Sequence, residues 1–94
     1  MNSNGRTPKV VPIDGLLDLH TFSPKDTKYV VNEYIHAAVD ADLTEIRIIH
    51  GRGIGVQRGI VQATLETHPL VTSFTDAPES HLGATVVNLN RRPE

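Results

Sequence analysis

The sequence predicts an α/β two-layer sandwich, in which a four-stranded mixed sheet carries both helices on one face in the order β-α-β-α-β-β. Two observations support this order. Short apolar segments rich in β-branched residues alternate with two longer segments whose apolar residues recur every three or four positions, as on one face of a helix. The first helix joins two strands in a right-handed crossover, which makes those strands parallel. A chain of 94 residues has room for one such domain.

Each element has its own local signal. A helix start is predicted at Ser23, a common capping residue, with Pro24 at the first helical position and Asp26 at the third. This helix should run to about Ala41 and turn one apolar stripe to the sheet. The other elements are a strand over 16–20, a strand over 44–50, a glycine turn over 51–55, a helix over 56–67, and strands over 71–75 and 84–90.

Composition argues against several classes of function. The formal net charge is −2, from 9 basic and 11 acidic residues, which is unlike a protein that coats nucleic acid through bulk charge. The chain contains no cysteine, so disulfides and thiolate metal sites are excluded. Aromatic residues are too scarce for a base-stacking platform of the RRM or OB type. They are Phe22, Tyr29, Tyr34 and Phe74.

The chain divides into an arm, one domain and a tail. Residues 1–12 are polar and aperiodic, so we predict a flexible arm there, a single domain over 13–90 and a flexible tail over 91–94. No stretch approaches the roughly 20 apolar residues of a membrane span, and the start is unlike a signal peptide. We therefore expect a cytoplasmic protein without a membrane partner. The oligomeric state is left open.

The first predicted strand carries a carboxylate and an imidazole. Alternation along the strand puts Asp18 and His20 on one face and the apolar Leu17 and Leu19 on the other. Such a pair suits an orienting carboxylate with a general acid or base, or two ligands of a metal ion. A solvated polar face without chemistry is the alternative.

A glycine-rich turn, His-Gly-Arg-Gly-Ile-Gly at 50–55, comes at the end of the second predicted strand. Its glycines let the backbone turn tightly and approach a ligand, and the next helix points free N–H groups at the turn. The residues expected to hold a phosphate are Gly51, Arg52, Gly53, Gly55 and Arg58. An ordinary strand-to-helix turn with a solvated arginine is the alternative. The spacing of the glycines fits neither the dinucleotide-binding fingerprint nor a Walker A loop. NAD and nucleoside triphosphates are therefore disfavoured as ligands.

Both motifs should arrive at one edge of the sheet, because neighbouring parallel strands end side by side. His50 would then join Asp18 and His20 as a third catalytic residue. Of the other histidines, His36 is predicted on the surface of the first helix. His68 is predicted as an imidazolium that complements the negative end of the second helix.

These motifs resemble those of the Smr (small MutS-related) domain. The resemblance covers roughly residues 14–90 and rests on Leu-Asp-Leu-His at 17–20, the glycine-rich turn at 50–55 and Gly-Ala-Thr-Val-Val-Asn-Leu at 83–89. It implies a fold like the C-terminal domain of bacterial translation initiation factor three. It also implies endonuclease activity, since members of the family nick DNA or cleave RNA, including messages on collided ribosomes.

The same resemblance assigns roles to residues. It makes Asp18 and His20 catalytic and assigns the phosphate-facing loop to His50, Gly51, Arg52 and Gly53. Two places depart from the family's pattern. Thr21 stands where a glycine often follows the first motif, and Ser80-His81-Leu82 precede Gly83 where a pair of glycines often stands. These departures leave the substrate preference and their effect on catalysis open.

The leading hypothesis is a small endonuclease that cleaves the RNA backbone or nicks DNA, with RNA slightly favoured. Asp18 would orient His20, which would act as general base on a 2′-hydroxyl or a water. Attack by a 2′-hydroxyl needs no metal, so no cofactor is expected, although a divalent metal is left open. The alternatives are a non-catalytic module that binds nucleic acid or the ribosome, and a hydrolase of small phosphate esters. The ribosome or a DNA-processing protein is the expected kind of protein partner.

Overall fold

The computed structural model describes residues 13–51, 55–77 and 83–91. The predicted arm over 1–12 and residues 92–94 of the predicted tail lie outside this description. Within the described ranges, helices and strands follow the predicted order. They are β1 (Leu16–Asp18), α1 (Pro24–Asp40), β2 (Glu45–Ile49), α2 (Val56–Glu66), β3 (Val71–Asp76) and β4 (Ala84–Leu89). Neither described helix is long and apolar enough to cross a membrane.

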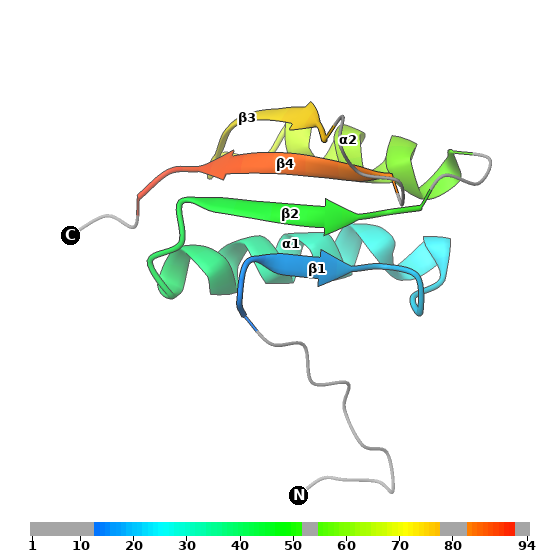
Figure 1. Ribbon diagram of the computed structural model, residues 1–94, viewed down its shortest axis with the longest axis horizontal. Helices are drawn as coiled ribbons and strands as arrows, with labels where there is room; N and C mark the ends of the chain where they lie inside the picture. Colours follow the sequence, from blue (N-terminus) through cyan, green and yellow to red (C-terminus); the bar gives the residue numbers. More distant parts are fainter. Residues whose placement is uncertain (1–12, 52–54, 78–82, 92–94) are drawn as a thin grey trace, which may run out of the picture.

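The described strands form one mixed sheet of four strands in the order β1-β2-β4-β3 (Figure 1). β1 is parallel to β2, as a right-handed crossover requires, and β4 is antiparallel to both β2 and β3. The register pairs Asp18 with Ile49 and Ile49 with Ala84. β1 and β2 therefore end beside the start of β4, and we call this end of the sheet the carboxyl edge.

Both helices cover one face of the sheet, as predicted, and the other face is open to solvent (Figure 1). Burial alternates along β2, where Ile46 and Ile48 are buried while Arg47 and Ile49 are partly exposed. The core lies between the sheet and the helices. Its helical members are Val31, Tyr34, Ile35, Ala38, Val39, Val61 and Leu65.

The start of α1 follows the prediction in part. Ser23 is the N-cap residue and Pro24 lies in the first turn, as expected. The Ser23 hydroxyl does not cap a backbone N–H, however, but donates to Oδ2 of Asp26 at 3.0 Å. Asp26 in turn places a negative charge in the first turn, where it complements the helix dipole.

The prediction for His68 was wrong. This residue is buried just beyond α2, and its ring centroid lies 5.2 Å from that of the exposed His36. The backbone N–H of Leu70 donates to His68 Nδ1 at 3.1 Å, so that nitrogen carries no proton. Burial lowers the pKa of His68, and the neighbouring His36 lowers it further. His68 is therefore a neutral buried residue, whereas the predicted surface position of His36 is confirmed.

Acid should destabilise the fold through His68. Because folding lowers its pKa, the unfolded chain binds this proton first, and stability falls as the pH drops below about 6.5 towards the folded pKa. Thermal unfolding between about pH 7.5 and pH 5 should show a smaller fall in midpoint for His68→Gln than for the wild type. The exposed His36→Gln variant is the control and should keep most of the fall. An equal fall in the His68 variant would contradict this account.

Candidate active site

Asp18 and His20 form a hydrogen-bonded pair where β1 ends. Oδ1 of Asp18 lies 2.9 Å from His20 Nδ1 and accepts from the His20 backbone N–H at 3.0 Å. The intervening Leu19 still pairs with the sheet, since its N–H donates to the carbonyl of Ile49 at 2.9 Å. The side chain of His20 is 75% exposed and that of Asp18 is 46% exposed. A ligand in solution can therefore reach both groups of the pair.

These contacts fix the tautomer of His20. An ionised carboxylate only accepts hydrogen bonds, so the proton of the neutral ring lies on Nδ1. The backbone and side-chain hydrogen bonds from His20 lower the pKa of Asp18 below 3.8, which keeps the carboxylate charged. Within the described part of the chain, no protein group bonds to Nε2. That nitrogen can therefore take a proton from a hydroxyl or a water.

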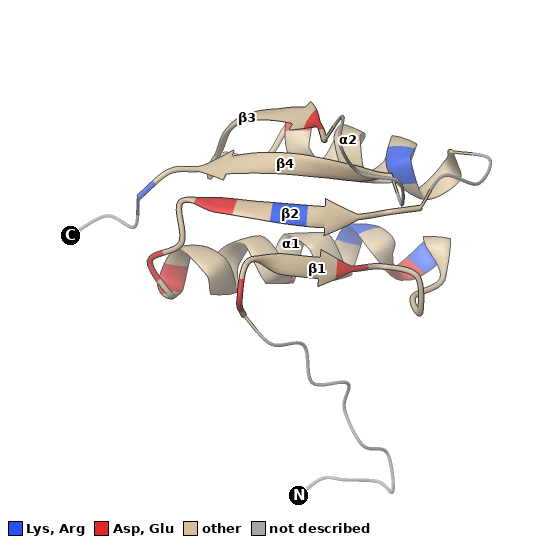
Figure 2. Ribbon diagram, viewed as in Figure 1, with Lys and Arg blue, Asp and Glu red and all other residues tan. Residues whose placement is uncertain are grey.

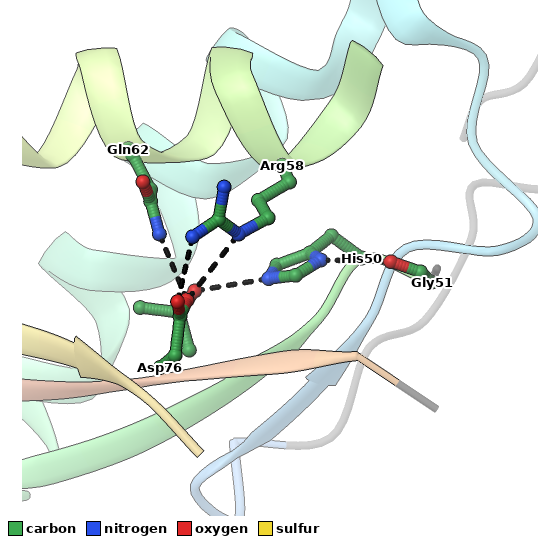
Figure 3. Close-up of polar contacts among 6 residues, drawn as sticks. His50, Gly51, Arg58, Gln62 and Asp76 are labelled. Atoms are coloured by element: carbon green, nitrogen blue, oxygen red, sulfur yellow. Dashed lines mark hydrogen bonds and ion pairs between the residues drawn. The ribbon is translucent and has the colours of Figure 1, made fainter. Parts of the chain in front are cut away.

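His50 is buried, and both of its ring nitrogens have partners (Figure 3). The residue is 7% exposed. Nδ1 lies 3.0 Å from the carbonyl oxygen of Gly51, and Nε2 lies 2.9 Å from Oγ1 of Thr85 on β4. Because a carbonyl only accepts, Nδ1–H donates to Gly51, and Nε2 of the neutral ring accepts from the Thr85 hydroxyl. His50 therefore connects the glycine-rich turn to β4.

The two motifs meet at the carboxyl edge but not through their side chains. Alternation along β2 puts His50 on the helix-covered side with Ile48, whereas Asp18 lies on the open face. No hydrogen bond joins His50 to either member of the pair among the residues that the structure describes. The structure thus brings the strand ends together, as predicted, while His20 and His50 occupy different environments.

The glycine-rich turn is described at its two ends. Gly51 and Gly55 have φ angles of 83° and 82°, in the left-handed region that strains any residue with a side chain. Gly55 is the N-cap residue of α2, so the N-terminal end of that helix lies at the carboxyl edge (Figure 1). The predicted phosphate-binding residues Arg52 and Gly53 lie outside the described residues.

Arg58 is paired with a carboxylate of β3 (Figure 3). Its Nη2 donates to Oδ2 of Asp76 at 2.6 Å and its Nε donates to Oδ1 at 3.3 Å, while Gln62 donates to the same Oδ1 at 3.0 Å. This pairing lowers the pKa of Asp76 and raises that of Arg58. The arginine is exposed, but a phosphate at this position has to compete with Asp76.

Gln57 has no sequence signature, yet it ties α2 to the loop that follows His20. Its Nε2 donates to the carbonyl of Phe22 at 2.9 Å and also lies 3.3 Å from Thr27 Oγ1. The carbonyl of Leu19 is a further acceptor at 3.4 Å. One amide group therefore positions the loop carrying His20 against the helix that begins at the glycine-rich turn.

All the lysines and arginines of the two described helices lie at the end of the molecule that holds the carboxyl edge (Figure 2). They are Lys25 and Lys28 in the first turns of α1 and Arg58 in α2. Acidic residues lie at both ends: Asp40, Asp42 and Glu45 are found where α1 finishes and β2 starts, and Asp18, Asp26 and Asp76 lie at the carboxyl-edge end. Lys25 and Lys28 have no ion-pair partner among the described residues, and they lie at the same end of the molecule as the pair.

The donor set near the pair is small. Asp18 and His20 supply one carboxylate oxygen donor and one imidazole nitrogen donor, which is half of a usual tetrahedral metal site. Across the described ranges, no three His, Asp or Glu side chains come together as a group that could hold a metal ion.

The fold and the site define a class of protein: a small α/β domain that presents an exposed carboxylate–imidazole pair beside a glycine-rich strand-to-helix turn. The chain belongs to the Smr domain family, whose model matches residues 17–90. This range contains the pair, the turn and most of the described elements, so the family resemblance seen in the sequence is confirmed.

Relatives and solved structures agree with this assignment. Endonuclease MutS2 of Thermomicrobium roseum is 39% identical over 84 residues, which are 87% of this chain and 10% of that protein. Endonuclease MutS2 of Caldicellulosiruptor bescii is 38% identical over 79 residues, or 82% of this chain and 10% of that protein. The chain therefore spans about a tenth of the length of these curated relatives.

Two crystal structures share the fold. The Smr domain of Thermus thermophilus MutS2 is 31% identical with a TM-score of 0.74, covering 83% of this chain and 98% of that one. YdaL, a stand-alone small MutS-related protein from Escherichia coli, is 25% identical with a TM-score of 0.74, covering 85% of this chain and 67% of that one. The predicted fold class is thereby confirmed.

Proposed function

We propose that this Smr domain is a small endonuclease that cleaves the RNA backbone or nicks DNA, with Asp18 and His20 as its proton-transferring pair. The observation that carries the proposal is the form of the exposed His20 ring. Asp18 holds the proton on Nδ1 and leaves Nε2 open to solvent. The relatives named endonuclease MutS2 support the reaction class.

The proposed reaction uses this geometry. Nε2 of His20 takes the proton of the attacking 2′-hydroxyl or water, and the charged Asp18 stabilises the imidazolium that forms. When a 2′-hydroxyl attacks, its oxygen bonds to the adjacent phosphorus and the bond to the 5′-oxygen breaks. The products are a 2′,3′-cyclic phosphate and a 5′-hydroxyl, whose proton comes from the imidazolium or from water.

The phosphate binds at the glycine-rich turn in this proposal. The N-terminal end of α2, which begins after Gly55, offers backbone N–H groups and the positive end of the helix dipole. Arg52 and Gly53 keep their predicted role as phosphate ligands. His50 acts as a positioning residue, because both of its nitrogens are engaged and its Nδ1–H fixes the carbonyl of Gly51.

Asp76→Asn should strengthen nucleic-acid binding by releasing Arg58. Because an ion pair between exposed side chains is weak, we expect a gain of about twofold to fivefold in affinity for single-stranded RNA at low salt. The salt dependence should steepen by about one phosphate contact. Glu66→Gln makes the same charge change at the far end of α2 and is the control. Equal gains in both variants would show a net-charge effect and remove Arg58 from the phosphate site.

The proposed activity is tested on labelled single-stranded RNA and on supercoiled plasmid, each with Mg²⁺ and with EDTA. We expect the wild type to cleave RNA to 2′,3′-cyclic products and the Asp18→Ala/His20→Ala double variant to leave both substrates intact. Cleavage that persists in EDTA would assign the step to protein groups alone. Equal cleavage by the double variant would contradict the proposal.

A binding module without catalysis is the second candidate. It is favoured because few of the predicted catalytic and phosphate-binding side chains are accessible and unpaired in the described part of the site. His50 is buried with both nitrogens occupied, and Arg58 is paired with Asp76, so His20 is the accessible imidazole at the edge within the described residues. A module of this kind binds RNA with a steep salt dependence, tolerates His20→Ala and forms no product.

A further inference from the structure

An apolar hollow of about 390 Å³ is bordered by one side of α1 and by Leu17 of the edge strand β1. Three of the four aromatic residues of the chain line it, so we call it the aromatic hollow. Besides Leu17, its lining includes Ile13, Phe22, Tyr29, Val30 and Tyr34. Tyr29 is 70% exposed and Ile13 is 38% exposed. Exposed apolar side chains gathered around one hollow mark a surface that another segment can cover.

A second hollow of about 420 Å³, which we call the polar hollow, adjoins the first. It shares three lining residues with the aromatic hollow and extends towards the start of α1, where Ser23 and Asp26 line it. The charged side chains that line the two hollows are both carboxylates, Asp26 in the polar hollow and Glu33 in the aromatic one. None of the described lysines and arginines lines either hollow. The occupant that these surfaces favour is therefore an apolar segment with a positive charge.

The chain contains such a segment immediately before Ile13. Residues 9–12 are Lys-Val-Val-Pro, a cation followed by three apolar residues, and Arg6 adds a second cation. The whole arm over 1–12 contains no aspartate or glutamate. The arm is therefore opposite in charge to the hollows, and its apolar part is the part nearest to them in the chain.

The arm joins the described part of the chain at the aromatic hollow. Ile13 lines this hollow, and the backbone N–H of Gly15 donates to the hydroxyl of Tyr34, another lining residue, at 3.0 Å. Asp26 and Tyr34 lie eight positions apart in α1, which corresponds to about 12 Å along the helix axis. Four extended residues span about 13 Å. Residues 9–12 are therefore long enough to reach from the aromatic hollow to Asp26 in the polar hollow.

We propose that residues 9–12 lie along the two hollows, with the valine side chains over Tyr29 and with Lys9 near Asp26. Because the segment belongs to the same chain, its short covalent connection gives it a high effective concentration at the hollows. Edge strands are sites at which chains associate, and the docked arm shields the edge of the sheet at β1. The predicted flexibility of the arm then applies only to the residues before Lys9. This inference does not depend on the proposed nuclease activity.

The test is the backbone mobility of the arm in the full chain, measured by NMR relaxation of the amide nitrogens. In the wild type, the order parameters of Val10 and Val11 should be close to that of a rigid backbone, about 0.85. Tyr29→Ala removes an exposed ring that lines both hollows, so the domain should stay folded while the two order parameters fall below about 0.6. Lys28→Ala changes the neighbouring residue, which lines neither hollow, and should keep the wild-type values.

A double variant tests the same contact from the side of the arm. Val10→Asp/Val11→Asp puts two carboxylates against the acidic hollows, so it should release the arm and shift the amide resonances of α1 around Tyr29. Asn2→Asp/Asn4→Asp makes the same charge change before the docked segment and should do neither. Order parameters below about 0.6 in the wild type, or an ordered arm in Tyr29→Ala, would overturn the proposal. So would a dimer in sedimentation that dissociates in the valine variant, because the arm of one copy then occupies the hollows of another.

Discussion

Asp18→Asn is expected to slow RNA cleavage by roughly 10²–10⁴-fold while leaving RNA affinity and the fold unchanged. The neutral amide cannot stabilise an imidazolium as the carboxylate does, and its NH₂ group competes for the hydrogen bond to His20 Nδ1. Asp18 is partly exposed and lies outside the core, so stability should change little. The measurement is the single-turnover rate at saturating protein, together with the binding constant.

The control for this variant is Asp14→Asn. Asp14 lies before β1, at the opposite end from the pair, and the change removes the same single charge. The pKa of Asp18 lies below 3.8, so the comparison between about pH 5 and pH 8 is always between a charged and an uncharged residue. A wild-type rate in Asp18→Asn would show that the carboxylate is not part of the mechanism.

His50→Ala is expected to lower the free energy of unfolding by about 2–4 kcal/mol, because it empties a buried site and leaves the Thr85 hydroxyl without its partner. That loss is large for a small domain, whose total stability is about 5–15 kcal/mol. Thr85→Val should cost about 1–3 kcal/mol by leaving Nε2 of the buried ring unpaired. Urea unfolding of each variant gives both values.

The double variant His50→Ala/Thr85→Val tests whether the two residues act together to position the turn. If His50 and Thr85 act as one unit, the double variant should lose less unfolding free energy than the sum of the two single losses, by about 0.5–3 kcal/mol. RNA affinity should fall with stability, because the carbonyl of Gly51 loses the donor that fixes the turn. A His50→Ala variant that unfolds at the wild-type urea concentration and binds RNA normally, yet cleaves nothing, would make His50 a reacting residue.

The fold could be predicted from the sequence because its signals are local. The three-to-four repeat in α1 correctly indicated that this helix turns one apolar stripe to the core, and the element bounds agree to within a few residues. The orientation of His50 could also have been predicted, because alternation along β2 makes this residue continue the buried series of Ile46 and Ile48. The burial of His50 follows from the same alternation along the strand.

The contacts that complete the site could not be predicted in this way. The Arg58–Asp76 pair joins residues 18 positions apart and depends on where β3 ends beside α2. The Gln57 contact spans 35 positions to Phe22 and depends on how the loop after β1 packs. The neutral state of His68 depends on burial and not on its position at a helix end. The two contacts and the neutral state of His68 all depend on tertiary packing, which cannot be predicted from a local sequence pattern.

The central claim is that Nε2 of His20 transfers the proton in cleavage. Its most direct test compares the single-turnover cleavage of one labelled RNA by the wild type and by His20→Ala, with the dissociation constant of each measured on the same RNA. The account predicts a rate loss of roughly 10²–10⁴-fold with an unchanged dissociation constant. Cleavage by His20→Ala at the wild-type rate would contradict it.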